Sequence, residues 1–216
     1  IYAMLDFLKI ATRRQRNGRI EVYPKFIIKK SNDLMIRGGD FYAIWIENRG
    51  LWSTDEQDAI DLIDNEINKF IDENKATFED NPPIRCYMWD SDTGTIDRWH
   101  KYCQRQSRDN FHQLDEKLIF SNQQTTREDY ASKKLPYPLE EGSCPAYEKI
   151  MSTLYTPEER AKIEWAIGSI VSGDSVNVQK FVVLYGAAGT GKSTVLNIIQ
   201  QLFDGYYSVF DAKALG

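Results

Sequence analysis

The sequence predicts an α/β protein in which an α+β region precedes the start of a second, α/β unit. Between residues 40 and 53, strand-like runs are separated by the turn Asn48-Arg49-Gly50 and follow the Gly38-Gly39 turn, which is typical of a β-hairpin with Tyr42, Ile44 and Ile46 on one face. From residue 53 onward the apolar residues recur with a helical period. Near residue 181 a short apolar run meets a glycine-rich turn and then another helical pattern. A strand, a loop and a helix are expected there in that order.

The first third of the chain predicts mainly short elements. Residues 2–12 fit a short helix, and the following stretch Arg13–Arg19 fits a basic linker with an Asn-Gly turn. Residues 20–30 fit strands broken by Pro24, because proline lacks the N–H group that a central strand needs. The arms of the hairpin are expected at Asp40–Glu47 and Gly50–Ser53.

Helices dominate the expected structure after the hairpin. Ser53 and Thr54 each begin a capping-box pattern, and an apolar stripe then continues to about Asn74. Residues 117–122 fit a short strand. Further helices are expected from about Thr95, from Pro145 and from Thr156-Pro157, where a threonine cap, an early proline and a glutamate three residues on coincide.

Composition limits what kind of protein this is. The chain has 216 residues, 42% hydrophobic and 27% charged, with a net charge of −5 and a pI of about 5.2. An acidic chain of this kind is not a general nucleic-acid binder. The sequence shows no membrane-spanning run and no signal peptide, and three widely spaced cysteines favour a reducing compartment. We therefore expect a cytoplasmic protein with no membrane partner. Because it starts at Ile1 and stops at Gly216, we also expect an internal fragment of a longer protein.

One motif carries specific chemistry. The segment Gly186–Ser193 reads GAAGTGKS and fits G-x-x-x-x-G-K-[ST], the Walker A phosphate loop. It follows the apolar run Phe181–Tyr185, which suits a buried central strand, and it precedes a helical pattern that opens at Lys192. This order of strand, loop and helix is the context that the motif requires. The alternative, a glycine-rich turn that binds nothing, lacks a reason for this order.

The chemistry of phosphate binding explains the residue types of the loop. Glycines let backbone N–H groups converge on phosphate oxygens, and the start of a helix adds unpaired N–H groups and a positive dipole end. Lys192 is expected to reach the β- and γ-phosphates of ATP and to be the catalytic residue, Ser193 to ligate Mg²⁺, and Thr194 to contact the α-phosphate. The full set of expected nucleotide-binding residues is Gly186, Ala187, Ala188, Gly189, Thr190, Gly191, Lys192, Ser193 and Thr194.

The order of patterns resembles a known family. The stretch FYAIWIENRGLWS, an Asn-containing turn in LIFSNQQ, a Pro-Tyr connector and a Cys-Pro helix start lead to the strand QKFVVLYG and Walker A, with FDGYY after the helix. This succession is similar to superfamily 3 replicative helicases of phages, mobile plasmids and poxviruses. The resemblance covers about residues 40–216, and Walker A is its only strongly specific motif.

The resemblance implies an AAA+-like ATPase that assembles as a hexameric homo-oligomer, with ATP at each subunit boundary and single-stranded DNA in its channel. It implies a linker or N-terminal segment at 1–39 that joins an upstream primase or primase-polymerase, a collar domain at 40–174, and the start of the helicase ATPase domain at 175–216. The acidic Walker B strand, the sensor and the arginine finger of such enzymes are expected after Gly216. A viral origin would place the protein in the host cytoplasm.

Two other functions stay open at this point. One is a non-catalytic oligomerisation or collar module with an incomplete nucleotide site. The other is a small-molecule kinase that uses the phosphate loop. A kinase normally begins near its phosphate loop, whereas about 180 residues precede the loop here.

Several other clusters have a structural interpretation that we favour over a functional one. His100 and Cys103 form at most one zinc-ligand pair, with His112, Cys86 and Cys144 elsewhere, so a buried thiol and surface imidazoles are expected. Asp90, Asp92 and Asp97 fit an Asp-rich turn before a helix.

Two further clusters leave a choice open. Arg13, Arg14, Arg16 and Arg19 fit a solvated linker, with phosphate contact as the alternative. The aromatic residues of the hairpin, Phe41, Tyr42, Trp45 and Trp52, fit core packing at strand spacing, with base stacking as the alternative.

Overall fold

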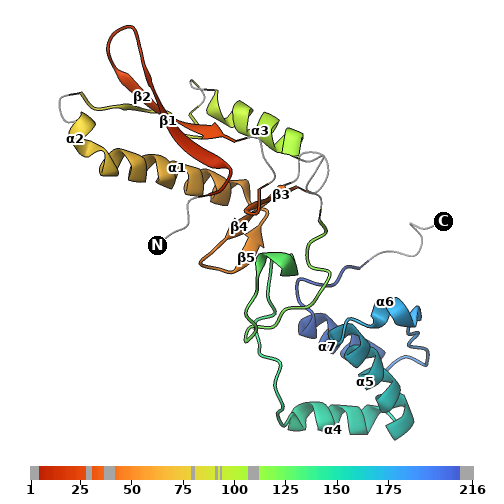
Figure 1. Ribbon diagram of the computed structural model, residues 1–216. Coiled ribbons are helices and arrows are strands. Elements are labelled where there is room, and N and C mark those ends of the chain that lie inside the picture. The colour runs from red at the N-terminus through yellow and green to blue at the C-terminus, as the bar shows by residue number, and fades with distance from the viewer. Residues whose placement is uncertain are drawn as a thin grey trace. The chain divides into compact units, whose positions relative to one another are not determined.

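The computed structural model describes residues 5–27, 31–36, 42–78, 81–90, 92, 94–106 and 112–209. It is a mixed α/β structure, as the sequence predicts (Figure 1). The chain forms two compact units. Unit 1 comprises residues 1–114 and 125–132, and unit 2 comprises residues 115–124 and 133–216. The functional boundaries expected at 39/40 and 174/175 stay predictions, and the compact units divide the chain at other places.

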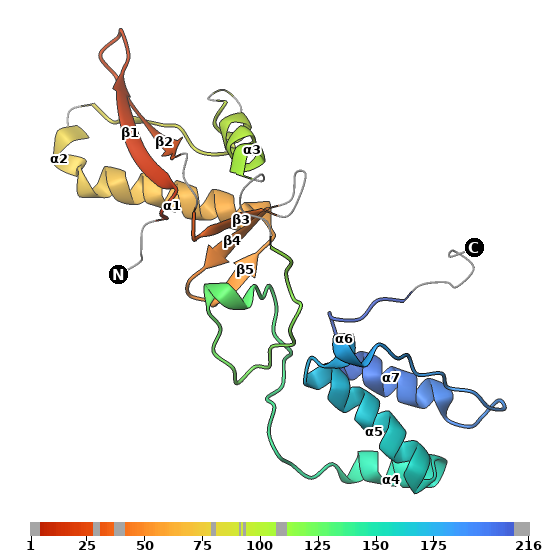
Figure 2. The ribbon, with the colours of Figure 1, turned by 45° about the vertical axis from the view of Figure 1, so that its right-hand side comes forward.

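Unit 1 contains two three-stranded sheets and two long helices (Figures 1 and 2). The first sheet has the order β1-β2-β6, with β1 and β2 antiparallel and β6 parallel to β2. The second has the order β3-β4-β5 and is antiparallel throughout. The elements are β1 (Leu8–Arg14), β2 (Ile20–Phe26), β3 (Leu34–Ile36), β4 (Tyr42–Ile46), β5 (Leu51–Ser53), α1 (Glu56–Glu73), α2 (Lys75–Phe78), β6 (Ile84–Arg85), α3 (Thr95–Gln106) and a 3₁₀ turn, Arg127–Asp129.

The helix expected at residues 2–12 is wrong over its described part, residues 5–12, and the linker expected at Arg13–Arg19 is wrong, but the Asn-Gly turn expected within that linker is confirmed. Leu8–Arg14 is strand β1, and the basic stretch forms its end and the turn to β2. Pro24 does not break β2, for a geometric reason. The carbonyl of Val22 accepts a hydrogen bond from the Cys86 N–H of the β6 side at 2.9 Å, and residues two apart face the same edge. Pro24 therefore lacks its N–H group on that side, and β6 pairs only with Glu21 and Val22.

The aromatic hairpin packs in the core, as expected. Tyr42, Ile44 and Ile46 of β4 face one cluster, where Trp99 of α3 is fully buried and donates its indole N–H to the Tyr42 hydroxyl at 3.0 Å. On the other face of β4, Trp45 packs edge-on against Trp52 of β5. Base stacking by these residues would require them to be exposed, and they are buried. Phe41 lies outside the described residues.

The expected amphipathic helix is present as α1. Its buried residues follow the predicted stripe, with Ile60, Ile63 and Ile67 facing the core. The helix starts later than Ser53 or Thr54, because Asp55 is the N-cap and accepts a hydrogen bond from the Gln57 N–H at 2.9 Å.

The named elements of unit 2 are helices, and the glycine-rich loop lies between the last two of them. Its elements are α4 (Pro145–Leu154), α5 (Pro157–Val171), α6 (Ser175–Val178) and α7 (Lys192–Leu202). The expected capping box of α5 is confirmed: Thr156 and Glu159 bond each other's backbone N–H groups. The strand expected over residues 117–122 is reduced to a single bridge between Phe120 and Leu135.

The buried central strand expected at Phe181–Tyr185 is not observed. The segment is extended but pairs with no strand among the described residues, and Phe181 and Tyr185 are 87% and 98% exposed. The physical reason is the absence of partners, because a strand is buried only when neighbouring strands and covering helices surround it. No helix within the described ranges is long and apolar enough to cross a membrane.

Candidate phosphate-binding site

The glycine-rich loop joins the extended segment Phe181–Tyr185 to the first turn of α7. Gly189 and Gly191 have φ angles of 81° and 82°, in the left-handed region that side-chain-bearing residues rarely adopt. At Gly191 a Cβ atom would also lie 2.6 Å from a methyl group of Leu154 in α4. Glycine is therefore favoured at both positions by the backbone conformation of the loop, and at Gly191 also by the close approach of Leu154.

Lys192 holds the loop together from inside. Its ammonium group donates hydrogen bonds to the carbonyls of Gly186 and Ala187 at 2.9 and 2.5 Å, and to the Thr190 hydroxyl at 3.2 Å. The Thr190 hydroxyl in turn donates to the Ala187 carbonyl at 3.0 Å. These hydrogen bonds hold the ammonium group of Lys192 against the loop. As the first residue of α7, Lys192 could instead have extended its side chain into solvent.

The start of α7 supplies further donors. Gly191 is the N-cap and offers no side chain to cap the helix, and the first helical bond runs from the Val195 N–H to the Gly191 carbonyl at 3.1 Å. The N–H groups of Lys192, Ser193 and Thr194 precede that bond, so none has an acceptor within the helix. Ser193 and Thr194 are exposed. Backbone donors, three hydroxyls and one ammonium group therefore lie together in the eight residues that follow Gly186.

Apolar packing fixes α7 to the rest of unit 2. Val195 is buried against Met151 of α4 and Ile163 of α5. The next turn places Ile199 between this cluster and a second one that contains Phe203 and Leu135. Helix α7 is therefore packed against residues that precede it in the sequence and against Phe203, which follows it.

Charged groups tie α4 to α5. Arg160 bridges Glu148 of α4 and Glu164 of its own helix, with nitrogen–oxygen distances of 2.6 and 2.7 Å. Both partners raise the pKa of Arg160, and the pairing with Arg160 lowers the pKa of Glu148. Tyr147 donates its hydroxyl to Glu164 at 3.2 Å, and burial followed by the nearby carboxylate raises the pKa of Tyr147 to about 12. This network positions the helix pair.

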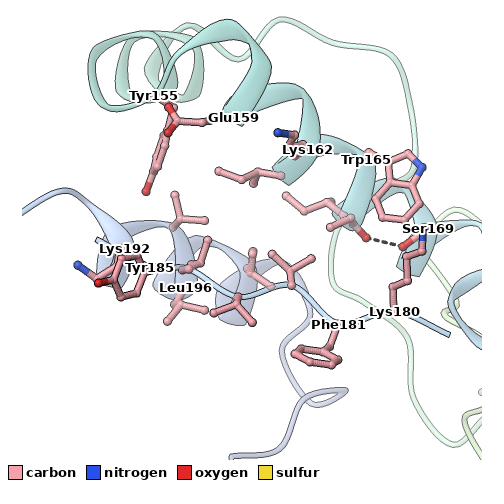
Figure 3. A pocket seen from close by; sticks show the side chains of 18 of the residues that line it. Tyr155, Glu159, Lys162, Trp165, Ser169, Lys180, Phe181, Tyr185, Lys192 and Leu196 are labelled. Carbon is pink, nitrogen blue, oxygen red and sulfur yellow. Dashed lines mark hydrogen bonds between the residues drawn. The ribbon is translucent and has the colours of Figure 1, made fainter. Parts of the chain in front are cut away.

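An apolar groove of about 850 Å³ lies beside the loop in unit 2. Its walls are α5, α7 and the extended segment Phe181–Tyr185 (Figure 3). Lys192 and Tyr185 lie at one end of the groove, and Trp165 and Lys180 lie at the other. Trp165 is 53% exposed. The sequence pattern did not predict this groove, although Trp165 stands outside the apolar stripe of α5, which was a signal that two sides of that helix are apolar.

The structure brings together all the predicted nucleotide-binding residues, but it does not complete a metal site. No group of three or more His, Cys, Asp or Glu residues within the described ranges could hold a metal ion. Ser193 is therefore the one predicted Mg²⁺ ligand that the described loop offers. Asp204 is exposed after the end of α7, and Asp211 lies outside the described residues.

The other clusters follow the structural interpretation. Cys103 is buried in α3 and burial raises its pKa, which favours an inert thiol. His100 is exposed and pairs with Glu56 at 2.6 Å, while His112 stacks on Tyr130. The Asp92 N–H donates to the Asp90 carboxylate at 3.1 Å, as in an Asp-rich turn.

Comparison with known proteins gives no further assignment. No protein-family model matches the chain, and neither the curated proteins nor the solved structures contain a match. The function must therefore be argued from the site itself.

Proposed function

We propose that the chain binds the phosphates of ATP through Gly186–Thr194 and contributes this site to an ATP-dependent replicative DNA helicase of the superfamily 3 type. The observation that carries the proposal is the position of the Lys192 ammonium, which is held over the carbonyls of a left-handed glycine loop at the start of a helix. These hydrogen bonds stabilise the loop itself, and they keep the ammonium group beside the unpaired N–H groups at the start of α7, where a phosphate would bind.

The chain's own residues divide the work of binding. The N–H groups of the loop and of the first turn of α7 would bond phosphate oxygens, and the ammonium group of Lys192 would balance their negative charge. The Ser193 hydroxyl would ligate Mg²⁺, and Thr194 would contact the α-phosphate. When bound, Mg²⁺-ATP would supply the phosphoanhydride bond whose hydrolysis drives movement on DNA.

Hydrolysis needs groups besides those of the phosphate loop. A second acid must hold Mg²⁺, a polar group must orient water, and an arginine must stabilise the transferring phosphoryl group. No acidic cluster lies within the described ranges beside Ser193. We therefore propose that residues 1–216 bind nucleotide weakly and do not hydrolyse it, and that the missing groups come from other segments or from a neighbouring subunit.

The helicase part of the proposal rests on the order of motifs along the chain. The hairpin at 42–53, the Pro-Tyr connector, the capped helix α5 and the phosphate loop follow one another as in superfamily 3 enzymes. On this basis the partners are single-stranded DNA, an upstream primase or primase-polymerase, and further copies of the same subunit in a hexameric ring. The proposed place of action is the cytoplasm.

DNA-stimulated ATP hydrolysis by the complete cellular protein tests this proposal. Lys192→Ala should lower the rate by orders of magnitude, because a charge-assisted contact to the phosphates is lost. Lys149→Ala, which removes an exposed lysine of α4, is the matched control and should leave the rate unchanged. Wild-type activity in Lys192→Ala, or hydrolysis that DNA does not stimulate, would reject the helicase assignment.

A second candidate is an assembly module with an incomplete nucleotide site, and the apolar groove favours it. Phe181, Val183 and Tyr185 are all more than half exposed on an extended segment with no strand partner among the described residues. Patches of this kind mark interaction sites. Sedimentation of the chain across concentrations separates the candidates. Assembly that survives Lys192→Ala but is lost in Val183→Ser, without any nucleotide binding by the wild type, would favour the assembly module.

A further inference from the structure

The β1–β2 hairpin of unit 1 ends in a turn whose geometry is fixed by hydrogen bonds. The Gln15 N–H donates to the Arg19 carbonyl at 2.8 Å, and the Gly18 N–H donates to the Gln15 carbonyl at 3.0 Å. Gly18 has a φ angle of 82°, and the Asn17 side chain accepts from the Arg19 N–H at 3.0 Å. Figures 1 and 2 show this turn extending past α2 and α3 of the same unit. It is a formed structure with an exposed tip.

Positive charge is concentrated on this hairpin. Residues 9–25 include six lysines and arginines and one carboxylate, which gives a net charge of +5. The whole chain carries −5, so the remaining residues together carry −10. An acidic protein with a local excess of positive charge on one hairpin attracts anions there and repels them elsewhere.

The one carboxylate of the hairpin, Glu21, has a structural role. Glu21 is nearly buried, and it accepts hydrogen bonds from Arg13 at 2.8 Å and from Gln15. These two contacts lower the pKa of Glu21, so it stays ionised and keeps the end of the hairpin in register. Glu21 therefore pairs with Arg13, whereas the arginines nearer the turn stay exposed to solvent.

Three arginines have no such partner. Arg14, Arg16 and Arg19 are exposed, and no carboxylate of the described residues pairs with their guanidinium groups. Protection of the open edge of β1 against pairing with other strands would explain charges along that strand. It does not explain Arg16 and Arg19, which lie in and after the turn, where there is no strand edge to protect.

We propose that Arg14, Arg16 and Arg19 at the tip of this hairpin bind the phosphodiester backbone of a nucleic acid. A guanidinium group pairs with a phosphate through two parallel N–H donors, and three such groups on one turn match a chain of phosphates. A two-stranded ribbon is also a shape that the major groove of duplex DNA admits. The inference rests on unit 1 alone and needs no nucleotide at the phosphate loop.

Salt dependence gives the proposal a quantitative form. Binding that neutralises three phosphates should show a slope of log affinity against log salt of about −3 on duplex DNA and about −2 on a single strand. On duplex DNA the affinity should therefore fall about 40-fold between about 50 and about 200 mM salt. The two slopes distinguish the two sources of phosphodiester.

Fluorescence anisotropy with the whole chain and short labelled oligonucleotides, duplex and single-stranded, provides the test. The variant Arg14→Gln/Arg16→Gln/Arg19→Gln should lose at least tenfold in affinity at low salt, and its salt slope should fall close to zero. The matched control removes three exposed lysines that are not part of the hairpin, Lys101→Gln/Lys117→Gln/Lys149→Gln, so its net charge changes equally. It should bind within about twofold of the wild type because the three arginines are kept. Thermal melting of both variants checks that the fold is kept, and Arg16→Gln alone provides a milder change at the tip.

Three results would overturn the inference. The first is equal loss of binding in the hairpin and control variants, which would indicate net charge alone. The second is nucleic-acid binding that survives the hairpin variant. The third is binding to phosphatidylserine vesicles without binding to either oligonucleotide, which would indicate a membrane surface. None of these results depends on ATP hydrolysis, so the hairpin and the proposed nucleotide site succeed or fail separately.

Discussion

Unit 1 and unit 2 differ in how many of their large aromatic side chains are exposed to solvent. In unit 1, Trp45, Trp52 and Trp99 are each at most 5% exposed, and Trp89 is the one tryptophan there that solvent reaches. In unit 2, Trp165, Phe181 and Tyr185 are all more than half exposed. Unit 1 therefore buries most of its tryptophans, whereas unit 2 exposes an apolar surface of the kind that marks interaction sites.

The difference has an energetic consequence. Burial of apolar surface contributes about 25 cal/mol per Å², so each exposed aromatic residue of unit 2 leaves stabilisation unused. Segments with few buried contacts open locally at low cost. We expect unit 1 to unfold cooperatively and the loop region of unit 2 to open well before it. The loop region also carries the proposed nucleotide site. Nucleotide binding and the binding of a partner in the apolar groove should therefore each favour the other.

The largest expected effect comes from the core of unit 1. Trp99 is fully buried and contacts the rings of Phe7, Phe26, Tyr42 and Tyr102. Trp99→Ala should lower the free energy of unfolding of unit 1 by about 3–5 kcal/mol, because a large cavity replaces these contacts. Trp89→Ala, at a position that is 71% exposed, should change it by less than about 0.5 kcal/mol.

Urea titration followed by peptide-resolved hydrogen exchange would measure both variants. The exchange of unit 2 should be unchanged in Trp99→Ala. If unit 2 loses protection together with unit 1, the two units are not independent and the comparison fails.

The next effect concerns the phosphate loop. Gly191→Ala places a side chain at a φ angle of 82° and against Leu154, so it should destabilise the start of α7 by about 1–2 kcal/mol. Gly168→Ala is the matched control, because Gly168 lies inside α5 with open space around it. That control should stabilise α5 by about 0.5–1 kcal/mol. Hydrogen exchange of α5 and α7 measures the stability change in both variants. Equal effects of the two substitutions would contradict the left-handed conformation of Gly191.

A smaller effect is expected at the cap of α5. Thr156→Ala removes the hydroxyl that accepts from the Glu159 N–H at 3.3 Å and should cost about 1 kcal/mol. Thr153→Ala, on the exposed side of α4, removes a hydroxyl that bonds its own helix and should have little effect. Thermal unfolding of the two variants gives the comparison, and similar melting temperatures would show that the capping box does not limit the stability of unit 2.

The smallest expected effect depends on pH. Asp64 of α1 is half-buried and accepts from the Met88 N–H at 2.8 Å, and burial raises its pKa. Because the folded pKa lies above the unfolded one, the carboxyl stabilises unit 1 when it is protonated, and that stability is lost as the pH rises through the folded pKa. Asp64→Asn should therefore be more stable than the wild type at neutral pH, with the difference shrinking in acid. A neutral-pH loss of stability would contradict this sign.

The sequence predicted those elements that local pattern decides. The stripe of α1, the hairpin of β4 and β5, the Thr156 cap and the start of α7 at Lys192 all follow from spacing and capping residues. It failed where a partner in space decides. Leu8–Arg14 is a strand because β2 pairs with it, and nothing within residues 2–12 shows that pairing.

The candidate site divides in the same way. The loop and Lys192 could be predicted because the motif specifies backbone conformation and charge within eight residues. The exposed state of Phe181–Tyr185 could not, because an apolar run reads as a buried strand whether or not other strands are beside it. In the β1–β2 hairpin, the Asn-Gly turn was predicted but the pairing of β1 with β2 was not, since the basic composition around the turn is equally typical of a linker.

Nucleotide binding by residues 1–216 tests the central claim, that unit 2 holds a formed phosphate loop whose catalytic partners lie elsewhere. Titration of the chain with Mg²⁺ and a fluorescent ATP analogue, combined with a phosphate-release assay, should show saturable binding that pyrophosphate displaces and no turnover. Lys192→Ala should weaken this binding about 10–100-fold, because a hydrogen bond to a charged group contributes about 1.5–3 kcal/mol, while Lys149→Ala should not change it. Equal binding by Lys192→Ala and the wild type, or turnover that depends on Lys192, would contradict the account.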